Sequence, residues 1–68
     1  MEDKNNIFVS IIIPTYNHSE YLKRALNSVL NQTYENWEAI VIDNYSSDNT
    51  SEVVDNFKNN KIKYLKVK

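Results

Sequence analysis

Apolar residues fall into three short runs along this chain, separated by two segments with helical spacing. Residues 8–13 (FVSIII) are rich in β-branched side chains and are stopped by a proline, which predicts a strand buried on both faces. Residues 37–42 (WEAIVI) predict a second strand that ends at Asp43. Residues 61–67 (KIKYLKV) alternate imperfectly, and their lysines are typical of a strand at a sheet edge.

Between these runs, apolar residues recur every three or four positions, which predicts two helices. Asn17 with Glu20, and later Asn49 with Glu52, have the form of capping boxes at the helix starts. The apolar face of the first helix consists of Leu22, Ala25, Leu26, Val29 and Leu30. The face of the second, shorter helix consists of Val53, Val54 and Phe57.

The order of elements predicts an α/β fold, a partial Rossmann-like β-α-β-α-β layer with three parallel strands and right-handed crossovers. We assign residues 1–7 to an N-terminal tail and residues 8–68 to a single domain. Open parallel sheets bind ligands outside the carboxyl ends of their strands. The candidate binding loops are therefore residues 14–17 (PTYN) and residues 43–48 (DNYSSD), which follow the first two strands.

Composition narrows the function classes. The chain has 68 residues, a net charge of −1, no glycine and no cysteine. Glycine-rich loops that cradle phosphates are therefore excluded within it, and its charge gives no indication of a nucleic-acid partner. The apolar runs are too short for a membrane segment, and the start MEDKNN is not a signal peptide. We expect a cytoplasmic protein, with the inner face of the membrane as a second location for a longer parent.

Three motifs in register carry a resemblance: VSIIIPTYN at residues 9–17, SVLNQT at 28–33 and EAIVIDNYSSDNT at 38–50. The chain resembles the amino-terminal part of the nucleotide-sugar-binding domain of family 2 glycosyltransferases, which have the GT-A fold. The resemblance implies the donor-binding part of an enzyme that transfers a sugar from a nucleotide-diphosphate sugar to an acceptor hydroxyl. It implies a UDP- or dTDP-sugar as the partner.

By the resemblance, the nucleotide contacts Pro14, Thr15, Tyr16, Asn17, Asp43 and Asn44. The family has a second acid where this chain has Asn44, and an amide offers both a donor and an acceptor to the base. The family's usual glycine is replaced by Tyr45, for which we expect a different turn.

The residues alone also support structural roles. Asp43 can accept backbone N–H groups from the turn that follows it, and Tyr16 can close the core at a strand end. Asp48 and Asn49 are typical helix caps, and the lone His18 is expected to be solvated. Turn formation is the expected role of Tyr45, Ser46 and Ser47.

The family's metal-binding DxD motif and general base have no counterpart in this sequence, so we expect no catalytic or metal-binding residue here. The resemblance implies Mg²⁺ or Mn²⁺ in the full-length family, and we expect this chain to be a truncated, inactive fragment. A non-catalytic nucleotide-binding or protein-interaction module on the same half-fold is the alternative. A receiver-like phosphoacceptor domain ranks last, because the loop after the first strand has no acid. The first strand would be an unpaired apolar edge, which predicts that the fragment forms a homodimer through that strand, aggregates or folds poorly.

Overall fold

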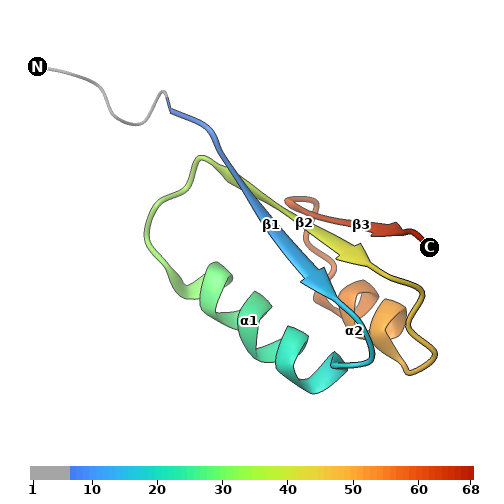
Figure 1. The fold of residues 1–68 in the computed structure, drawn as a ribbon. Coiled ribbons are helices and arrows are strands. Elements are labelled where there is room, and N and C mark those ends of the chain that lie inside the picture. The colour runs from blue at the N-terminus through green and yellow to red at the C-terminus, as the bar shows by residue number, and fades with distance from the viewer. Residues whose placement is uncertain (1–6) are drawn as a thin grey trace, which may run out of the picture.

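Five elements follow one another in the computed structural model, which describes residues 7–68 (Figure 1). They are β1 (Val9–Thr15), α1 (Ser19–Asn31), β2 (Trp37–Asp43), α2 (Thr50–Phe57) and β3 (Ile62–Lys66). The predicted α/β layer with three parallel strands is confirmed. The predicted tail lies outside the described residues except for Ile7. Within the described part of the chain, neither helix is long and apolar enough to cross a bilayer.

The sheet has β2 at its centre, between β1 and β3. Thr15 of β1 lies opposite Asp43 of β2, and Asp43 lies opposite Lys66 of β3. Because all three strands are parallel and end in register, their carboxyl ends share one edge of the sheet. The loops after β1 and β2 therefore start side by side.

Both helices cover the same face of the sheet (Figure 1), and the core lies between them and β2. Residues of β2 alternate between buried and half-buried positions, as expected for a central strand with one covered face. The buried apolar residues are Leu22, Leu26, Trp37, Ala39, Val41 and Val54.

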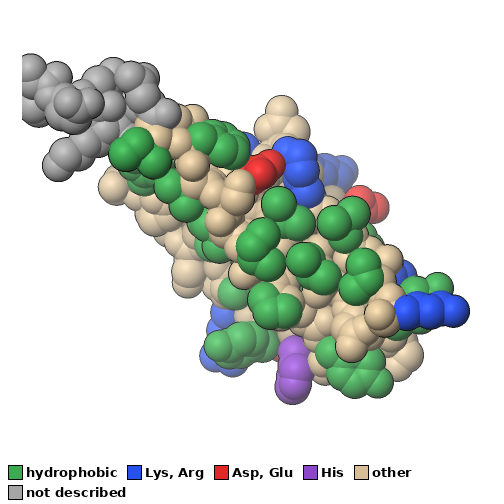
Figure 2. Space-filling model, turned by 45° about the horizontal axis from the view of Figure 1, so that its top comes forward, with side chains coloured by type: hydrophobic (Ala, Val, Ile, Leu, Met, Phe, Trp, Pro, Cys, Tyr) green, Lys and Arg blue, Asp and Glu red, His purple; other side chains and the backbone are tan. Residues whose placement is uncertain are grey.

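The prediction that the first strand is buried on both faces was wrong. Ile11 and Ile13 pack against the core, but Ile12 between them is 53% exposed. Right-handed crossovers that step in one direction across a sheet place both helices on one face, so the other face stays open. Figure 2 shows hydrophobic side chains gathered on this open face. Leu65 of β3 also lies there and is 54% exposed.

The open face carries one polar group of interacting side chains. Glu38 of β2 accepts a hydrogen bond from the Ser10 hydroxyl at 2.7 Å and pairs with the Lys63 ammonium at 3.3 Å. The Ser10 hydrogen bond and the Lys63 interaction lower the pKa of Glu38 below its ordinary value. The charges of Glu38 and Lys63 compensate one another, so this group adds no net charge to the open face.

Neither predicted capping box forms. The N-cap residue of α1 is His18 and that of α2 is Asn49, and neither side chain makes a capping hydrogen bond. Asp48 supplies both caps instead: its Oδ2 accepts from the Ser19 amide at 3.2 Å and its Oδ1 from the Thr50 amide at 3.1 Å. The hydrogen bond from the Thr50 hydroxyl is the main reason that the pKa of Asp48 is lowered. One carboxylate thus fixes the starts of both helices at the same edge.

Candidate functional site

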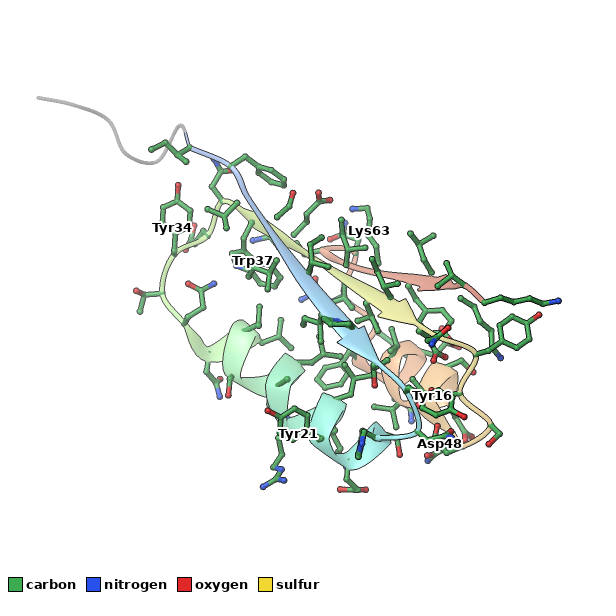
Figure 3. The ribbon with its side chains drawn as sticks, in the orientation of Figure 1. Tyr16, Tyr21, Tyr34, Trp37, Asp48 and Lys63 are labelled. Carbon is green, nitrogen blue, oxygen red and sulfur yellow. The ribbon has the colours of Figure 1, made fainter. Side chains whose placement is uncertain are left out.

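The two loops predicted to bind a ligand lie against each other at the carboxyl edge of the sheet. We call residues 14–17 together with residues 43–48 the rim. The Asn44 amide donates to the Thr15 carbonyl oxygen at 3.0 Å, and the Asn17 amide donates to the Ser46 hydroxyl oxygen at 2.8 Å. Figure 3 shows Tyr16 beside Asp48 at this end of the sheet, with Tyr34 and Trp37 at the opposite end. The structure therefore brings the two predicted loops together.

Asn17 joins the loops through its side chain as well. Its Oδ1 accepts from the Ser47 amide at 2.8 Å and from the Asp48 amide at 3.3 Å. Its backbone has a φ of 51°, in the left-handed region that asparagine tolerates better than most residues. The asparagine predicted to cap α1 instead holds the second loop in place, which explains why the first capping box is absent.

Asp43 is a buried member of the rim and is only 1% exposed. Its Oδ1 accepts from the Ser46 amide at 2.9 Å and from the Ser46 hydroxyl at 2.5 Å. Its Oδ2 accepts a hydrogen bond from the Tyr64 hydroxyl of β3. The carboxylate that ends β2 therefore faces the protein in this structure, and its structural role as a turn acceptor is confirmed.

The hydrogen bonds around Asp43 decide its protonation state. Burial on its own raises the pKa of a carboxyl group, but donation by Ser46 and Tyr64, together with the nearby charge of Lys66, lowers the pKa of Asp43 below its ordinary value. Burial and the neighbouring Asp43 carboxylate raise the pKa of Tyr64 from 10.0 to about 12. At neutral pH the pair is therefore an ionised carboxylate and a protonated phenol.

This pair predicts a loss of stability at high pH. Folding raises the pKa of Tyr64 from 10.0 to about 12. The resulting stabilisation is complete at pH values below the pKa of the unfolded state, and it is lost as the pH rises through the pKa of the folded state. We expect the difference in unfolding free energy between the wild type and Tyr64→Phe to shrink above about pH 10. Urea denaturation of both proteins across this range measures it. A constant difference across that range would contradict the assignment.

Several rim side chains are exposed, and two of them, on Tyr16 and Asn44, have chemistry that suits a nucleobase. The Tyr16 ring is 55% exposed, and Asn44 is also exposed with its backbone fixed to β1. An exposed aromatic ring can stack on a nucleobase, and an amide can donate and accept at a base edge. Of the other predicted contacts, Pro14 and Asn17 are exposed and Thr15 is partly buried.

Within the rim, Tyr45 forms an aromatic and basic group with Lys66 and Lys68 that sequence reasoning missed. Its backbone φ is 57°, an uncommon value for a tyrosine, and its ring is 54% exposed. The ammonium groups of Lys66 and Lys68 lie 5.2 Å and 5.8 Å from the ring centre. These distances fit cation–π contacts, which a reading of Tyr45 as a turn former did not anticipate.

A pocket of about 590 Å³ adjoins the rim at the start of α1. It is lined by Asn17, His18, Ser19, Glu20, Tyr21, Arg24 and Asp48. His18 is exposed, as expected, and lies at the pocket wall. Among residues 7–68, no three histidine, cysteine or acidic side chains come close enough to hold a metal ion.

Comparison with known proteins finds similarity to glycosyltransferases. A family model described as glycosyl transferase family 2 matches residues 10–68. A UDP-Glc:alpha-D-GlcNAc-diphosphoundecaprenol beta-1,3-glucosyltransferase, WfgD of Escherichia coli, is 46% identical over 61 residues, which cover 90% of this chain and 24% of that protein. Glycosyltransferase AglE of Haloferax volcanii is 46% identical over 52 residues, 74% of this chain and 17% of that protein.

A third relative is named for teichoic acid biosynthesis. The minor teichoic acid biosynthesis protein GgaA of Bacillus subtilis is 45% identical over 64 residues, covering 85% of this chain and 14% of that protein. The chain thus spans between 14% and 24% of the length of these three relatives.

Proposed function

The chain belongs to glycosyltransferase family 2, and on this premise we propose that its rim binds the nucleotide of a nucleotide-diphosphate sugar. It would be the donor-binding part of an enzyme that transfers the sugar to an acceptor hydroxyl. The observation that carries the proposal is the joining of the two loops at the carboxyl edge, with Tyr16 and Asn44 exposed on them. This is the edge at which open parallel sheets bind ligands.

The roles of the rim residues follow from their chemistry. Tyr16 stacks on the base. Asn44 pairs with the base edge, accepting from an imide N–H through Oδ1 and donating to a carbonyl through Nδ2. Uracil and thymine present both groups side by side, which favours UDP- and dTDP-sugars. The remaining proposed residues, Pro14, Thr15, Asn17 and Asp43, form and support the surface on which the nucleoside lies.

Sugar transfer needs more chemistry than the described residues offer. A divalent Mg²⁺ or Mn²⁺ ion, which the resemblance implies, would neutralise the diphosphate leaving group. The acidic residues described here do not gather to hold such an ion. We propose that the 68-residue chain alone binds a donor without transferring sugar.

Location and partners complete the proposal. The name of the Escherichia coli relative gives it a sugar acceptor carried on diphosphoundecaprenol, a lipid. We propose cytoplasmic action, with the inner face of the membrane as a second location for a longer parent protein. We also propose a homodimer through β1, because that strand lies at the sheet edge and unpaired strand edges favour association with a second copy.

Titration of the labelled chain with UDP, dTDP and GDP, followed by amide NMR, tests nucleotide binding. We expect UDP and dTDP to shift the amides of Tyr16, Asn17 and Asn44. We expect Tyr16→Ala to weaken UDP binding about tenfold, the usual size of a lost base–aromatic stack. Tyr34→Ala is the matched control, because Tyr34 lies at the opposite end of the sheet from Tyr16 (Figure 3). If none of the three nucleotides moves a rim amide, the proposed function is wrong.

A further inference from the structure

A continuous chain of hydrogen bonds runs from β3 through the rim to the loop after β1. The Tyr64 hydroxyl donates to Asp43 Oδ2, and Asp43 Oδ1 accepts from the Ser46 hydroxyl at 2.5 Å. The Ser46 hydroxyl oxygen in turn accepts from the Asn17 amide at 2.8 Å. Asp43 is 1% and Ser46 7% exposed, so water does not compete freely for these bonds. These hydrogen bonds link β3 and β2 to Asn17, the residue next to Tyr16 in the loop after β1.

We propose that Tyr64 is a positioning residue of the donor site, acting through Asp43 and Ser46 on the backbone at Asn17. The proposal rests on the proposed function, because it concerns the loop that presents Tyr16 to the nucleotide. Tyr64 itself packs against the hydrophobic core on the helix side of the sheet. It therefore acts through other residues rather than by touching the ligand.

The direction of each hydrogen bond follows from the number of protons available. A serine hydroxyl has one proton, and an ionised carboxylate only accepts. Ser46 therefore donates to Asp43 and keeps a lone pair for the Asn17 amide. Tyr64 is the only side chain outside the rim that the structure shows donating to Asp43 within residues 7–68. It fixes the carboxylate from below, and the carboxylate fixes the Ser46 hydroxyl.

Removing the Tyr64 hydroxyl leaves a buried carboxylate oxygen without its donor. The carboxylate recovers a hydrogen bond by turning this oxygen toward water. This movement would break its hydrogen bond with the Ser46 hydroxyl, and then the bond between Ser46 and the Asn17 amide. A loop that is not held in its binding conformation must be ordered when the ligand arrives, which weakens binding. We therefore expect a substitution of Tyr64 in β3 to weaken nucleotide binding at the loop that carries Tyr16.

The experiment measures UDP affinity by NMR for the wild-type 68-residue chain and for Tyr64→Phe. We expect Tyr64→Phe to bind UDP about tenfold more weakly, the size of one hydrogen bond to a charged group. We also expect its Asn17 and Ser46 amide signals to move before any ligand is added. Tyr34→Phe is the matched control, because the Tyr34 hydroxyl donates to the Ile7 carbonyl at the other end of the sheet.

Ser46→Ala breaks the same series of hydrogen bonds at a second, independent point. If Tyr64→Phe does not fold, the UDP affinity of Ser46→Ala tests the proposal instead. Wild-type affinity in either folded variant would overturn the positioning role and leave the proposed function standing. Equal losses in Tyr64→Phe and Tyr34→Phe would also overturn it, because they would reflect stability alone. Absence of UDP binding to the wild type would instead overturn the proposed function, on which this inference rests.

Discussion

Asp43→Ala is expected to leave the chain largely unfolded at room temperature. The substitution removes the acceptor for the Ser46 amide and for the Tyr64 hydroxyl, both next to a residue that is 1% exposed. Each buried donor left without a partner costs about 1–3 kcal/mol, so the loss is about 4 kcal/mol. A domain of this length has a total stability of roughly 3–10 kcal/mol, and small domains lie toward the low end. Circular dichroism with urea denaturation measures the effect.

Asp43→Asn is the matched variant, because it keeps the shape and removes the charge. Its Oδ1 can still accept from Ser46, while its amide nitrogen faces the Tyr64 oxygen, which can accept. We expect it to lose about 1–2 kcal/mol and to stay folded. If the alanine variant were as stable as the asparagine variant, the hydrogen bonds to Asp43 would contribute little to the fold.

The sequence predicted the elements and their order well, because each depends on local patterns. A β-branched run stopped by Pro14, and an apolar run that ends at Asp43, mark two strands whatever surrounds them. The parallel arrangement follows from the intervening helices. The neighbouring positions of the two loops follow in turn, since strands that end in register bring their loops together.

Asp48 was predicted as a cap of α2, and its hydrogen bond from the Thr50 amide confirms this. The cap of α1 could not be predicted, because it is a long-range contact. Asn17 has the right spacing to cap α1, but its side chain meets Ser47, thirty positions later in the sequence. Asp48 reaches Ser19 across a similar separation. Local spacing shows which residue types are able to cap a helix. It does not show which partner the fold brings within reach.

Ser46 and Tyr64 were missed for a related reason. Serine after a strand is a common turn former, and a tyrosine in a strand is common in any sheet. Tyr64 meets Asp43 only because β3 pairs with β2 in a register that places Tyr64 opposite Val41 on the covered face. Asp43 itself was predicted as a ligand contact and lies buried within the rim, so its position needed the structure.

A pair of leucine substitutions tests the one-sided core. Leu26 on α1 is 0% exposed, whereas Leu65 on the open face is 54% exposed. We expect Leu26→Ala to destabilise the chain by about 3 kcal/mol, from lost burial and the cavity left behind. Leu65→Ala is expected to change the unfolding free energy by less than about 1 kcal/mol, because the side chain already meets water. Urea denaturation of both variants beside the wild type measures the difference.

Repeating these measurements at two chain concentrations separates the fold from association. Binding that occurs only in the folded state raises apparent stability with concentration. A homodimer through the β1 edge would raise the midpoint for the wild type and both variants alike, and Leu26→Ala would remain the more damaging change. A loss at Leu65 as large as that at Leu26 would mean that the open face is covered in solution. Both faces of the sheet would then be buried in solution, and β1 would not be a strand with one solvent-exposed face.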